Sequence, residues 1–324
     1  MKHNCNVLYY ILGIIFIQAM AWKKTYGTIC FVIIWSFMQE NKKILSIGSL
    51  VIDRINGKKR PGGEATNVAV NTQRLGVDAS LLTVAARSPE SVVLQEEIEA
   101  LGVSFFALSQ VLEKLPECHI YMGADGKEEG YDWIDNGLES AYATSEVPVS
   151  LVQAYQTVYL AACEPGFAYR VSQQVQSHQT VVFNPGTRIY EDPGMFMQTH
   201  RQSSITFMNQ SEFDHLQVKK YVRTEEDLLY SSEQMVIITA GKNGARLVTK
   251  EGIKNYPAQL VPAIDETGAG DSFASAVIWA LGRGLEMDAA MVSASILASL
   301  VVQRVGAQID AETAAHFIQQ IVNQ

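Results

Sequence analysis

The stretch "GAGDSF" at residues 268–273 lies between a strand-like run and an apolar helix pattern. Three of its first four residues are Gly or Ala, and the fourth is a carboxylate, Asp271. A helix start without bulky side chains exposes free backbone N–H groups, and the positive end of the helix dipole favours an anion there. The stretch therefore predicts a phosphate-binding turn, with Asp271 placed to accept the proton of an attacking hydroxyl. A lone GxGD is more often an ordinary strand-to-helix turn, so the hypothesis needs support from elsewhere in the chain.

The chain before this turn alternates between strand-like and helical patterns. Such alternation is typical of an α/β fold with a mostly parallel sheet and helices on both faces. The run "ECHIYMGADGKEEGYDWI" predicts a hairpin that turns at Asp125-Gly126. Strand-like runs occupy 43–53, 79–86, 103–109, 157–164, 180–186, 204–210 and 235–241, the last four each expected to precede a helix, and helical patterns occupy 65–76, 89–102, 268–283, 287–305 and 311–322.

Composition excludes several classes of function. The 324 residues carry a formal net charge of −9 and no basic tract, which argues against a nucleic-acid partner. The four cysteines are far apart and form no CxxC pair, so neither a disulfide framework nor a zinc site is indicated. A reducing cytosol fits this usage.

The first 37 residues differ from the rest. Two apolar stretches, 7–21 and 28–38, are separated by Lys23 and Lys24, and each is shorter than the roughly 20 residues that span a bilayer. Three interpretations stay open: a membrane anchor, a cleaved signal, or a mis-assigned start with Met38 as the initiator. We expect residues 38–324 to form one cytoplasmic domain after this hydrophobic leader.

Polar residues follow other predicted strands, where ligands bind in open parallel sheets. Asp53 is expected at the end of the first strand, and Gly62-Gly63 precede Asn67 at a helix start. Asn209 and Glu212 stand one helical turn apart after another strand, a spacing that can hold hydrated Mg²⁺ beside phosphates. Each has an ordinary explanation as a cap or turn residue, but together they favour phosphoryl transfer.

With these residues quoted, the chain resembles the ribokinase-like carbohydrate kinase (PfkB) family over about residues 43–324. "DETGAGDSF" (265–273) is similar to the family's DTxGAGDxF signature, and the GG…N…LG pattern of 62–76 to its N-terminal signature. "NQSE" (209–212), "ITAGKNGA" (238–245) and "QRVGA" (303–307) correspond to three further motifs, in the family's order. The resemblance implies a ribokinase-like sheet with a reduced β-lid.

The resemblance also implies ATP-dependent transfer of the γ-phosphate to an alcohol of a sugar or polyol. Asp271 would be the catalytic base, with Gly268, Ala269 and Gly270 as the anion hole. Substrate would be held by Asp53, Gly63, Asn67, Glu164 and Asn184. The nucleotide would lie near Asn209, Thr239, Gly241 and Ser295. Mg²⁺ would be positioned by Asn209 and Glu212, and a monovalent cation such as K⁺ would contact Asp265.

The sequence departs from the family in several places. Val51 and Glu64 stand where a polar residue and a Lys are frequent, and Ser295 stands where many members have Asn. Only eight residues separate Asp53 from Gly62, so this segment is expected to form at most a stub, with the 117–134 hairpin as the main cover.

Two other functions and one assembly state stay open. One is a nucleoside kinase whose base stacks on Phe105, Tyr121 or Tyr131. The other is a non-catalytic sugar-binding sensor, against which the intact Asp271 and anion hole argue. A homodimer is also left open.

Overall fold

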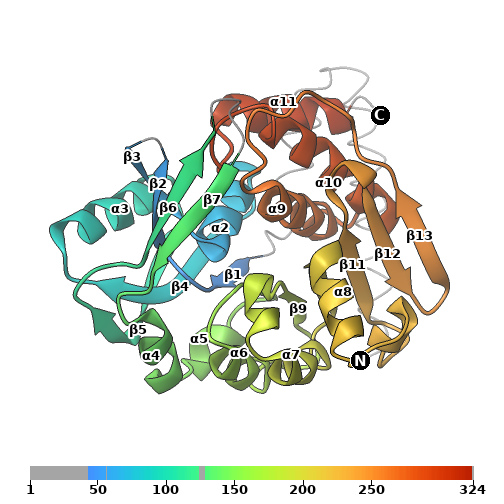
Figure 1. Cartoon of the computed structure of the whole chain (residues 1–324), viewed down its shortest axis with the longest axis horizontal. Coiled ribbons are helices and arrows are strands. Elements are labelled where there is room, and N and C mark those ends of the chain that lie inside the picture. The colour runs from blue at the N-terminus through green and yellow to red at the C-terminus, as the bar shows by residue number, and fades with distance from the viewer. Residues whose placement is uncertain (1–42, 56, 124–127, 323–324) are drawn as a thin grey trace, which may run out of the picture. The chain divides into compact units, whose positions relative to one another are not determined.

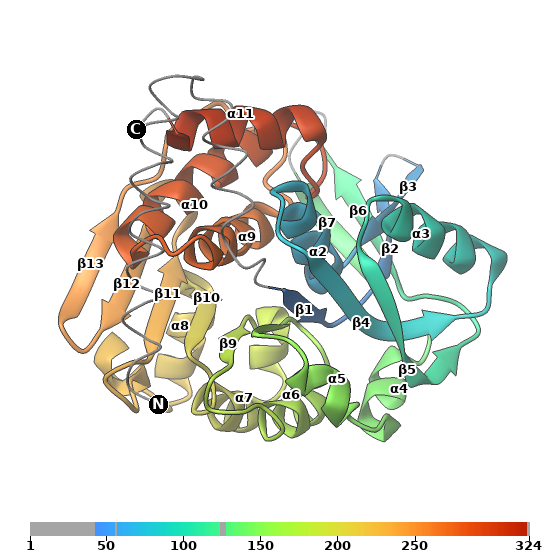
Figure 2. The ribbon, with the colours of Figure 1, turned by 180° about the vertical axis from the view of Figure 1, so that it is seen from behind.

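The computed structural model describes residues 43–55, 57–123 and 128–322, and residues 42–324 form one compact unit. The hydrophobic leader and the predicted turn at Asp125-Gly126 lie outside the described residues. Figure 1 shows a central sheet with helices above and below it, and Figure 2 shows the same arrangement from behind. This is the α/β architecture that the alternating pattern predicts.

The central sheet has nine strands in the order β13-β12-β11-β10-β9-β8-β1-β4-β5. All neighbouring pairs from β11 to β5 are parallel, and the β11–β12 and β12–β13 pairs are antiparallel. The strands are β1 (Ile44–Ile47), β4 (Ala79–Ala86), β5 (Ser104–Leu112), β8 (Thr157–Leu160), β9 (Thr180–Phe183), β10 (Ile205–Asn209), β11 (Met235–Thr239), β12 (Ala245–Thr249) and β13 (Gly252–Tyr256).

One predicted connection is wrong. A helix was expected after β11, but the chain turns through the short 3-10 helix η3 (Gly241–Asn243) into the β12–β13 hairpin. Ala240 and Gly244 close this turn with a backbone hydrogen bond of 2.7 Å. The turn thereby projects the "GKNG" segment beyond the carboxyl end of β11.

Each face of the sheet carries its own apolar core. Alternate strand residues divide between the two: Ile44 packs on one side, and Leu45 and Ile47 pack on the other. Burial on both faces explains the continuous apolar runs of these strands. The Ile44 face is covered by α2 (Glu64–Arg74), α3 (Pro89–Ala100), α9 (Ala269–Gly282), α10 (Met287–Val301) and α11 (Ala311–Val322), and the other face by α4 (Leu138–Thr144), α5 (Val149–Gln153), α6 (Pro165–Ser172), α7 (Pro193–His200) and α8 (Gln210–Val218).

A second sheet of four strands corrects two expectations about the lid. Its order is β3 (Lys58–Gly62), β2 (Val51–Ile55), β6 (Glu117–Met122) and β7 (Glu128–Ile134). Asp53 therefore lies within β2 of this sheet and not at the end of β1, which stops at Ile47. The chain leaves the central sheet where the Leu50 N–H donates to the Thr83 hydroxyl at 3.0 Å. The segment expected to form a stub instead supplies the end of β2 and most of β3.

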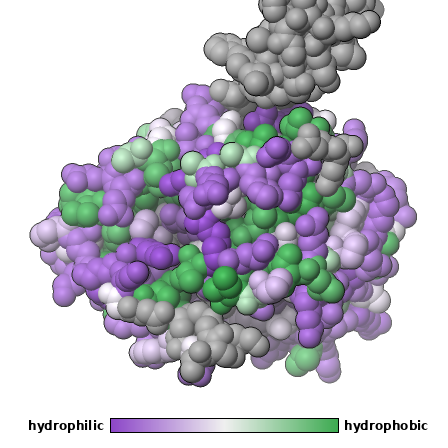
Figure 3. Space-filling model, turned by 90° about the horizontal axis from the view of Figure 1, so that it is seen from above, coloured by the Kyte–Doolittle hydropathy of each residue, from purple (hydrophilic) through white to green (hydrophobic). Residues whose placement is uncertain are grey.

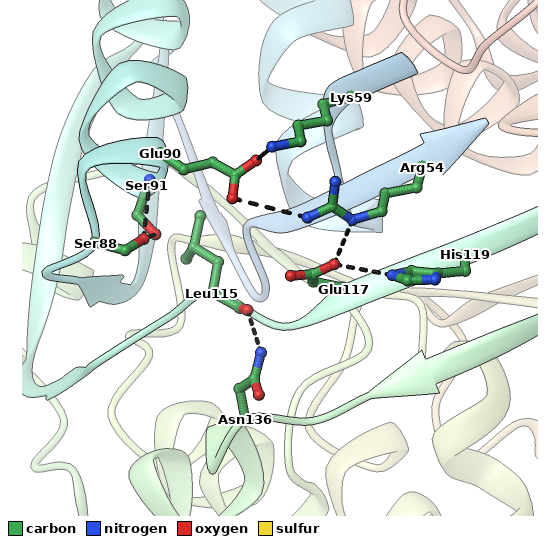
Figure 4. Close-up of polar contacts among 9 residues, drawn as sticks. All are labelled: Arg54, Lys59, Ser88, Glu90, Ser91, Leu115, Glu117, His119 and Asn136. Carbon is green, nitrogen blue, oxygen red and sulfur yellow. Dashed lines mark hydrogen bonds and ion pairs between the residues drawn. The ribbon is translucent and has the colours of Figure 1, made fainter. Parts of the chain in front are cut away.

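An ionic cluster joins this lid sheet to α3 (Figure 4). Arg54 of β2 pairs with Glu117 of β6 and with Glu90 of α3, and Lys59 of β3 also pairs with Glu90. The His119 Nε2 lies 2.9 Å from the Glu117 carboxylate. Because successive strand side chains point to opposite faces, Asp53 faces away from this cluster. The lid is thus tied on its outer face while its inner face is free to meet ligands.

Within the described residues, no helix is long and apolar enough to cross a membrane. On the face seen in Figure 3, hydrophilic residues surround smaller hydrophobic areas.

Candidate active site

The N-terminus of α9 offers free backbone donors. Ser272 N–H makes the first intrahelical bond, to the Gly268 carbonyl at 2.9 Å, and Ala269 N–H donates to the Glu266 carbonyl at 3.2 Å. The N–H groups of Gly268, Gly270 and Asp271 have no acceptor among the described residues. Unpaired donors at a helix start, at the positive end of its dipole, suit a phosphate. Of the predicted anion-hole amides, that of Ala269 is thus already engaged.

The turn before α9 is held by the distant "RVGA" segment. Gly268 has a φ of 74°, and a Cβ placed on it would lie 2.1 Å from the Ala307 Cβ, so only glycine fits there. The buried Asp265 carboxylate accepts from Thr267 N–H at 2.9 Å and from Gly306 N–H at 2.8 Å. Asp265, predicted as a cation contact, is therefore the residue that ties these two turns together.

Asp271 is the buried carboxylate at the centre of the site. Its Oδ2 accepts from the Asn67 Nδ2 at 2.8 Å, so α2 and α9 meet through these two side chains. The Gln308 Nε2 in turn donates to the Asn67 Oδ1 at 3.2 Å and to the Pro61 carbonyl at 2.8 Å. Burial raises the pKa of Asp271 to about 6, against the lowering effect of the Asn67 hydrogen bond. The carboxylate can still ionise near neutral pH, as a general base must.

Two cavities meet at this helix start. One, of about 230 Å³, lies between the η3 turn, α9 and α10, and includes Thr239, Gly241 and Ser295 in its lining. The other, of about 390 Å³, lies under the lid sheet and is lined by Asp53, Gly63, Asn67, Asn184, Asn209, Glu212 and Asp271, among others. Thr239, Glu266, Ala269 and Gly270 line both. A group bound at the α9 N-terminus is therefore accessible from either side.

The cavity under the lid is rich in carboxyl groups. Asp53 from β2 and Glu64 from the first turn of α2 face it together with Asp271. Burial raises the pKa of Asp53 to about 7, and the nearby Asp271 adds to the effect. Burial likewise raises the pKa of Glu64 well above its usual range, with further contributions from Asp271 and Glu212. These carboxyls share an environment that favours hydrogen-bond donors or cations as partners.

Residues 32–314 match the pattern of the pfkB family carbohydrate kinases. The chain belongs to the pfkB family. Its relatives include a nucleoside kinase of Methanothermobacter thermautotrophicus, 25% identical over 84% of this chain and 93% of that protein. Another is an ATP-dependent ribose-1-phosphate kinase of Halopiger xanaduensis, 25% identical over 76% of this chain and 82% of the relative.

A solved structure, the nucleoside kinase of Methanocaldococcus jannaschii, superposes on this pfkB kinase with a TM-score of 0.74 at 20% identity. The match covers 86% of this chain and 98% of that one, which is described as an archaeal member of the ribokinase family. The central sheet and small lid sheet are thus those of a ribokinase-like fold. Kinases of the pfkB family use ATP and Mg²⁺.

The residues predicted to position Mg²⁺ form a capping box at the start of α8. The Glu212 carboxylate accepts from the Asn209 N–H at 2.8 Å and from its Nδ2 at 2.9 Å. Burial raises the pKa of Glu212 to about 7, so a cation nearby would favour its ionised form. An amide and a carboxylate at the cavity wall fit a hydrated Mg²⁺, which needs few protein ligands. Accordingly, the described residues contain no cluster of three or more His, Cys, Asp or Glu that could hold a metal alone.

The remaining predicted residues of the pfkB kinase differ in whether they reach the site. Asn184 follows β9, lines the lid cavity, and donates to the Tyr159 hydroxyl at 3.1 Å. Glu164 instead caps α6, where its carboxylate accepts from Gly166 and Phe167 N–H at 2.8 and 2.7 Å. It is not among the described residues that line either cavity. The cap satisfies the carboxylate locally, which explains why it does not reach the site.

Several site residues were not anticipated from the sequence, among them Gln308 and Lys242. Gln308 holds Asn67, and Lys242 lines the cavity beside η3. Both directly follow or lie within motifs already quoted, "QRVGA" and "ITAGKNGA", so motif proximity was the available signal.

Proposed function

We propose that this protein is an ATP-dependent kinase that transfers the γ-phosphoryl group to an alcohol of a sugar or polyol. One observation carries the proposal: two cavities adjoin at the α9 N-terminus, with the buried Asp271 on the lid side. Two substrates can then meet at one set of free amides, which is the geometry that phosphoryl transfer needs.

The nucleotide is assigned to the cavity beside η3. Its lining includes the predicted Thr239, Gly241 and Ser295. Lys242, which also lines it, supplies positive charge for the phosphates. The amides of Gly268, Gly270 and Asp271 would then receive the γ-phosphoryl oxygens and stabilise their charge in the transition state.

The acceptor is assigned to the cavity under the lid. Asp53, Asn67 and Asn184 would bind its hydroxyl groups. Gly63 lines the same cavity and, having no side chain, would let the acceptor lie close to the backbone. Asp271 takes the proton of the attacking hydroxyl as the new O–P bond forms and the bond to the leaving ADP breaks. Asn67 orients the carboxylate through the 2.8 Å hydrogen bond. Glu212 and Asn209 would hold hydrated Mg²⁺, which neutralises phosphate charge when bound.

A nucleoside acceptor is the second candidate. Tyr131 of β7 and Phe207 of β10 line the acceptor cavity and offer faces on which a base could stack. The two other predicted aromatics do not support it: Phe105 packs against the core of the α9 face, and the Tyr121 hydroxyl bonds Asp132. Among the relatives, the Methanothermobacter protein is named a nucleoside kinase.

The test is a screen of the purified protein for ADP release with ATP, Mg²⁺ and a panel of sugars, polyols and nucleosides. The Asp271→Asn variant is the matched control, because it keeps the shape and hydrogen bonding of the site but removes the base. We expect kcat to fall by roughly 10²–10⁴-fold while ATP and acceptor binding change little. ADP release that no acceptor increases, or a variant keeping more than about a tenth of kcat, would refute the assignment.

A further inference from the structure

The charge of the acceptor cavity is one-sided. Of the described residues that line it, five are Asp or Glu and none is Lys, Arg or His. The five are Asp53, Glu64, Glu212, Glu266 and Asp271. By contrast, the adjoining nucleotide cavity contains Lys242. Phosphate charge can therefore be balanced on the nucleotide side but meets no basic side chain on the acceptor side.

The proposed reaction gives no role to two carboxyls of this group, Glu64 and Glu266, and of these Glu64 is the one with an unpaired buried oxygen. Its Oε2 is fully buried and has no hydrogen-bond partner among the described residues. A backbone hydrogen bond from Ala162 favours the ionised form of the group, although burial outweighs it. The carboxyl group packs on Gly186, where an added Cβ would lie 2.3 Å from the Glu64 Oε1. Because Gly186 has no side chain, its backbone can lie close to the Glu64 carboxyl group. The unpaired Oε2 of Glu64 remains at the cavity wall.

The nearest basic side chains are committed elsewhere. Arg188 lowers the pKa of Glu64 only as a minor contribution, and its guanidinium pairs with Glu139 and, at 2.8 Å, with Glu191. Arg60, opposite Asp53 in the lid hairpin, donates from its Nη1 to the Val305 carbonyl at 2.9 Å. Neither is among the described residues that line the cavity. An anionic group entering there would be desolvated with no counter-ion, beside carboxyl groups whose ionised forms are already disfavoured by burial.

We propose that the acceptor is an uncharged polyhydroxy compound, that Glu64 accepts a hydrogen bond from one of its hydroxyl groups, and that acceptors already carrying a phosphate or carboxylate are rejected. This inference rests on the proposed kinase function and deepens it. A buried polar atom without a hydrogen-bond partner is unfavourable. A hydroxyl group of the bound substrate that donates to the Glu64 Oε2 would remove this cost, which favours binding. The lack of a basic counter-ion in the lining supplies the rejection, and any carboxyl of the cavity that is ionised adds to it.

The experiment compares neutral acceptors with their phosphorylated counterparts on the full chain. Suitable pairs are ribose with ribose 1-phosphate, fructose with fructose 1-phosphate, and inosine with its 3′-phosphate. Within the pair that contains the best substrate, we expect kcat/KM for the neutral member to exceed that for the anion by more than about tenfold, or 1.4 kcal/mol. Better turnover of the anionic member would overturn the inference and leave the kinase function intact.

If no compound is turned over, the proposed function fails, and binding still decides the inference. Thermal unfolding would then be measured with each member of a pair, and the neutral compound should raise Tm while the anion does not. Stabilisation by the anion alone would contradict the proposal.

Variants separate recognition from structure. Glu64→Gln should raise KM for the neutral acceptor by about tenfold with kcat within about threefold, because an NH2 donor replaces one of the two accepting oxygens while the base is unchanged. Glu64→Lys should shift the neutral-to-anionic kcat/KM ratio toward the anion by more than about tenfold. Glu312→Gln makes the same chemical change in the first turn of the remote helix α11 and should alter neither quantity. A ratio that stays the same in Glu64→Lys, with Tm alone affected, would assign Glu64 a purely structural role.

Discussion

Asp53 should bind substrate at the expense of stability, and the size of this effect follows from its surroundings. The side chain lies over Gly62 in the lid hairpin, where a Cβ on Gly62 would be 1.9 Å from the Asp53 Oδ2. Its pKa is about 7, compared with the ordinary value of 3.8, chiefly because of burial and then because of Asp271. Such a difference corresponds to roughly 2–4 kcal/mol of lost stability once the group must ionise in the folded state.

The pH window of this effect is defined by the two pKa values. Below about pH 3.8 the group is protonated in both the folded and the unfolded chain, so its charge affects neither. Between pH 3.8 and about 7 the folded chain binds more protons than the unfolded chain, so stability falls as pH rises. Above about pH 7 the whole penalty is present. Asp53→Asn, which cannot ionise, should therefore be more stable than the parent at pH 8 and equally stable near pH 3.5.

Thermal unfolding of both proteins at pH 8 and pH 3.5 measures this difference. For a domain of this size the gain at pH 8 should appear as a Tm increase of about 3–7 °C, accompanied by a raised acceptor KM. Glu117→Gln on the same lid sheet is the control of opposite sign. The Arg54 hydrogen bond lowers the pKa of Glu117 to about 2, so its ionised form stabilises the fold above pH 4.5. That variant should lose stability at pH 8. An Asp53→Asn protein no more stable than the parent at pH 8 would refute the reasoning.

Two further predictions concern pH and the leader. Because the base must be ionised and the pKa of Asp271 is about 6, kcat/KM should rise from pH 5 and level off above about pH 7. Asp53 and Glu212, whose pKa values are about 7, also face the cavity and steepen this limb, and burial raises the pKa of Glu64 in the same direction. A profile that is flat between pH 5 and 7 would exclude Asp271 as the base. A chain that begins at Met38 should keep the kcat and KM of the full chain, since every described residue lining the two cavities lies at or after Asp53; a loss of folding would show that residues 1–37 contribute to the domain.

Most of the fold could be predicted from periodicity, whereas the lid could not. The three C-terminal helices begin within one residue of the expected positions, because their apolar spacing is regular and turn residues precede each. The run 43–53 looks like one strand because both its halves are apolar, yet it is divided between two sheets. The departure depends on the Leu50–Thr83 hydrogen bond, between residues 33 positions apart. Local pattern carries no information about such a partner, and the prediction that Asp53 ends the first strand was wrong for that reason.

The site shows the same division between local and distant information. Strand-end residues such as Asn184, Asn209 and Thr239 were correctly expected to converge, since parallel strands present their carboxyl ends at one edge. The link between Asn67 and Asp271 joins residues 204 positions apart, and the one between Asn67 and Gln308 joins residues 241 apart. The role of Gln308 depends on that packing, and no sequence motif of its own predicted it.

These long-range links bear on why the signature glycines, the lid and the base occur together. Gly62 gives the Asp53 carboxylate room, and Gly63 starts the helix whose Asn67 reaches Asp271. Gln308 closes the circuit by bonding both Asn67 and the Pro61 carbonyl of the lid hairpin. A displacement of the hairpin is therefore transmitted to the residue that orients the base. The lid hairpin and the Asp271 carboxylate are thus connected through two amide side chains, those of Gln308 and Asn67, so under the proposed function acceptor binding beneath the lid would also align the base.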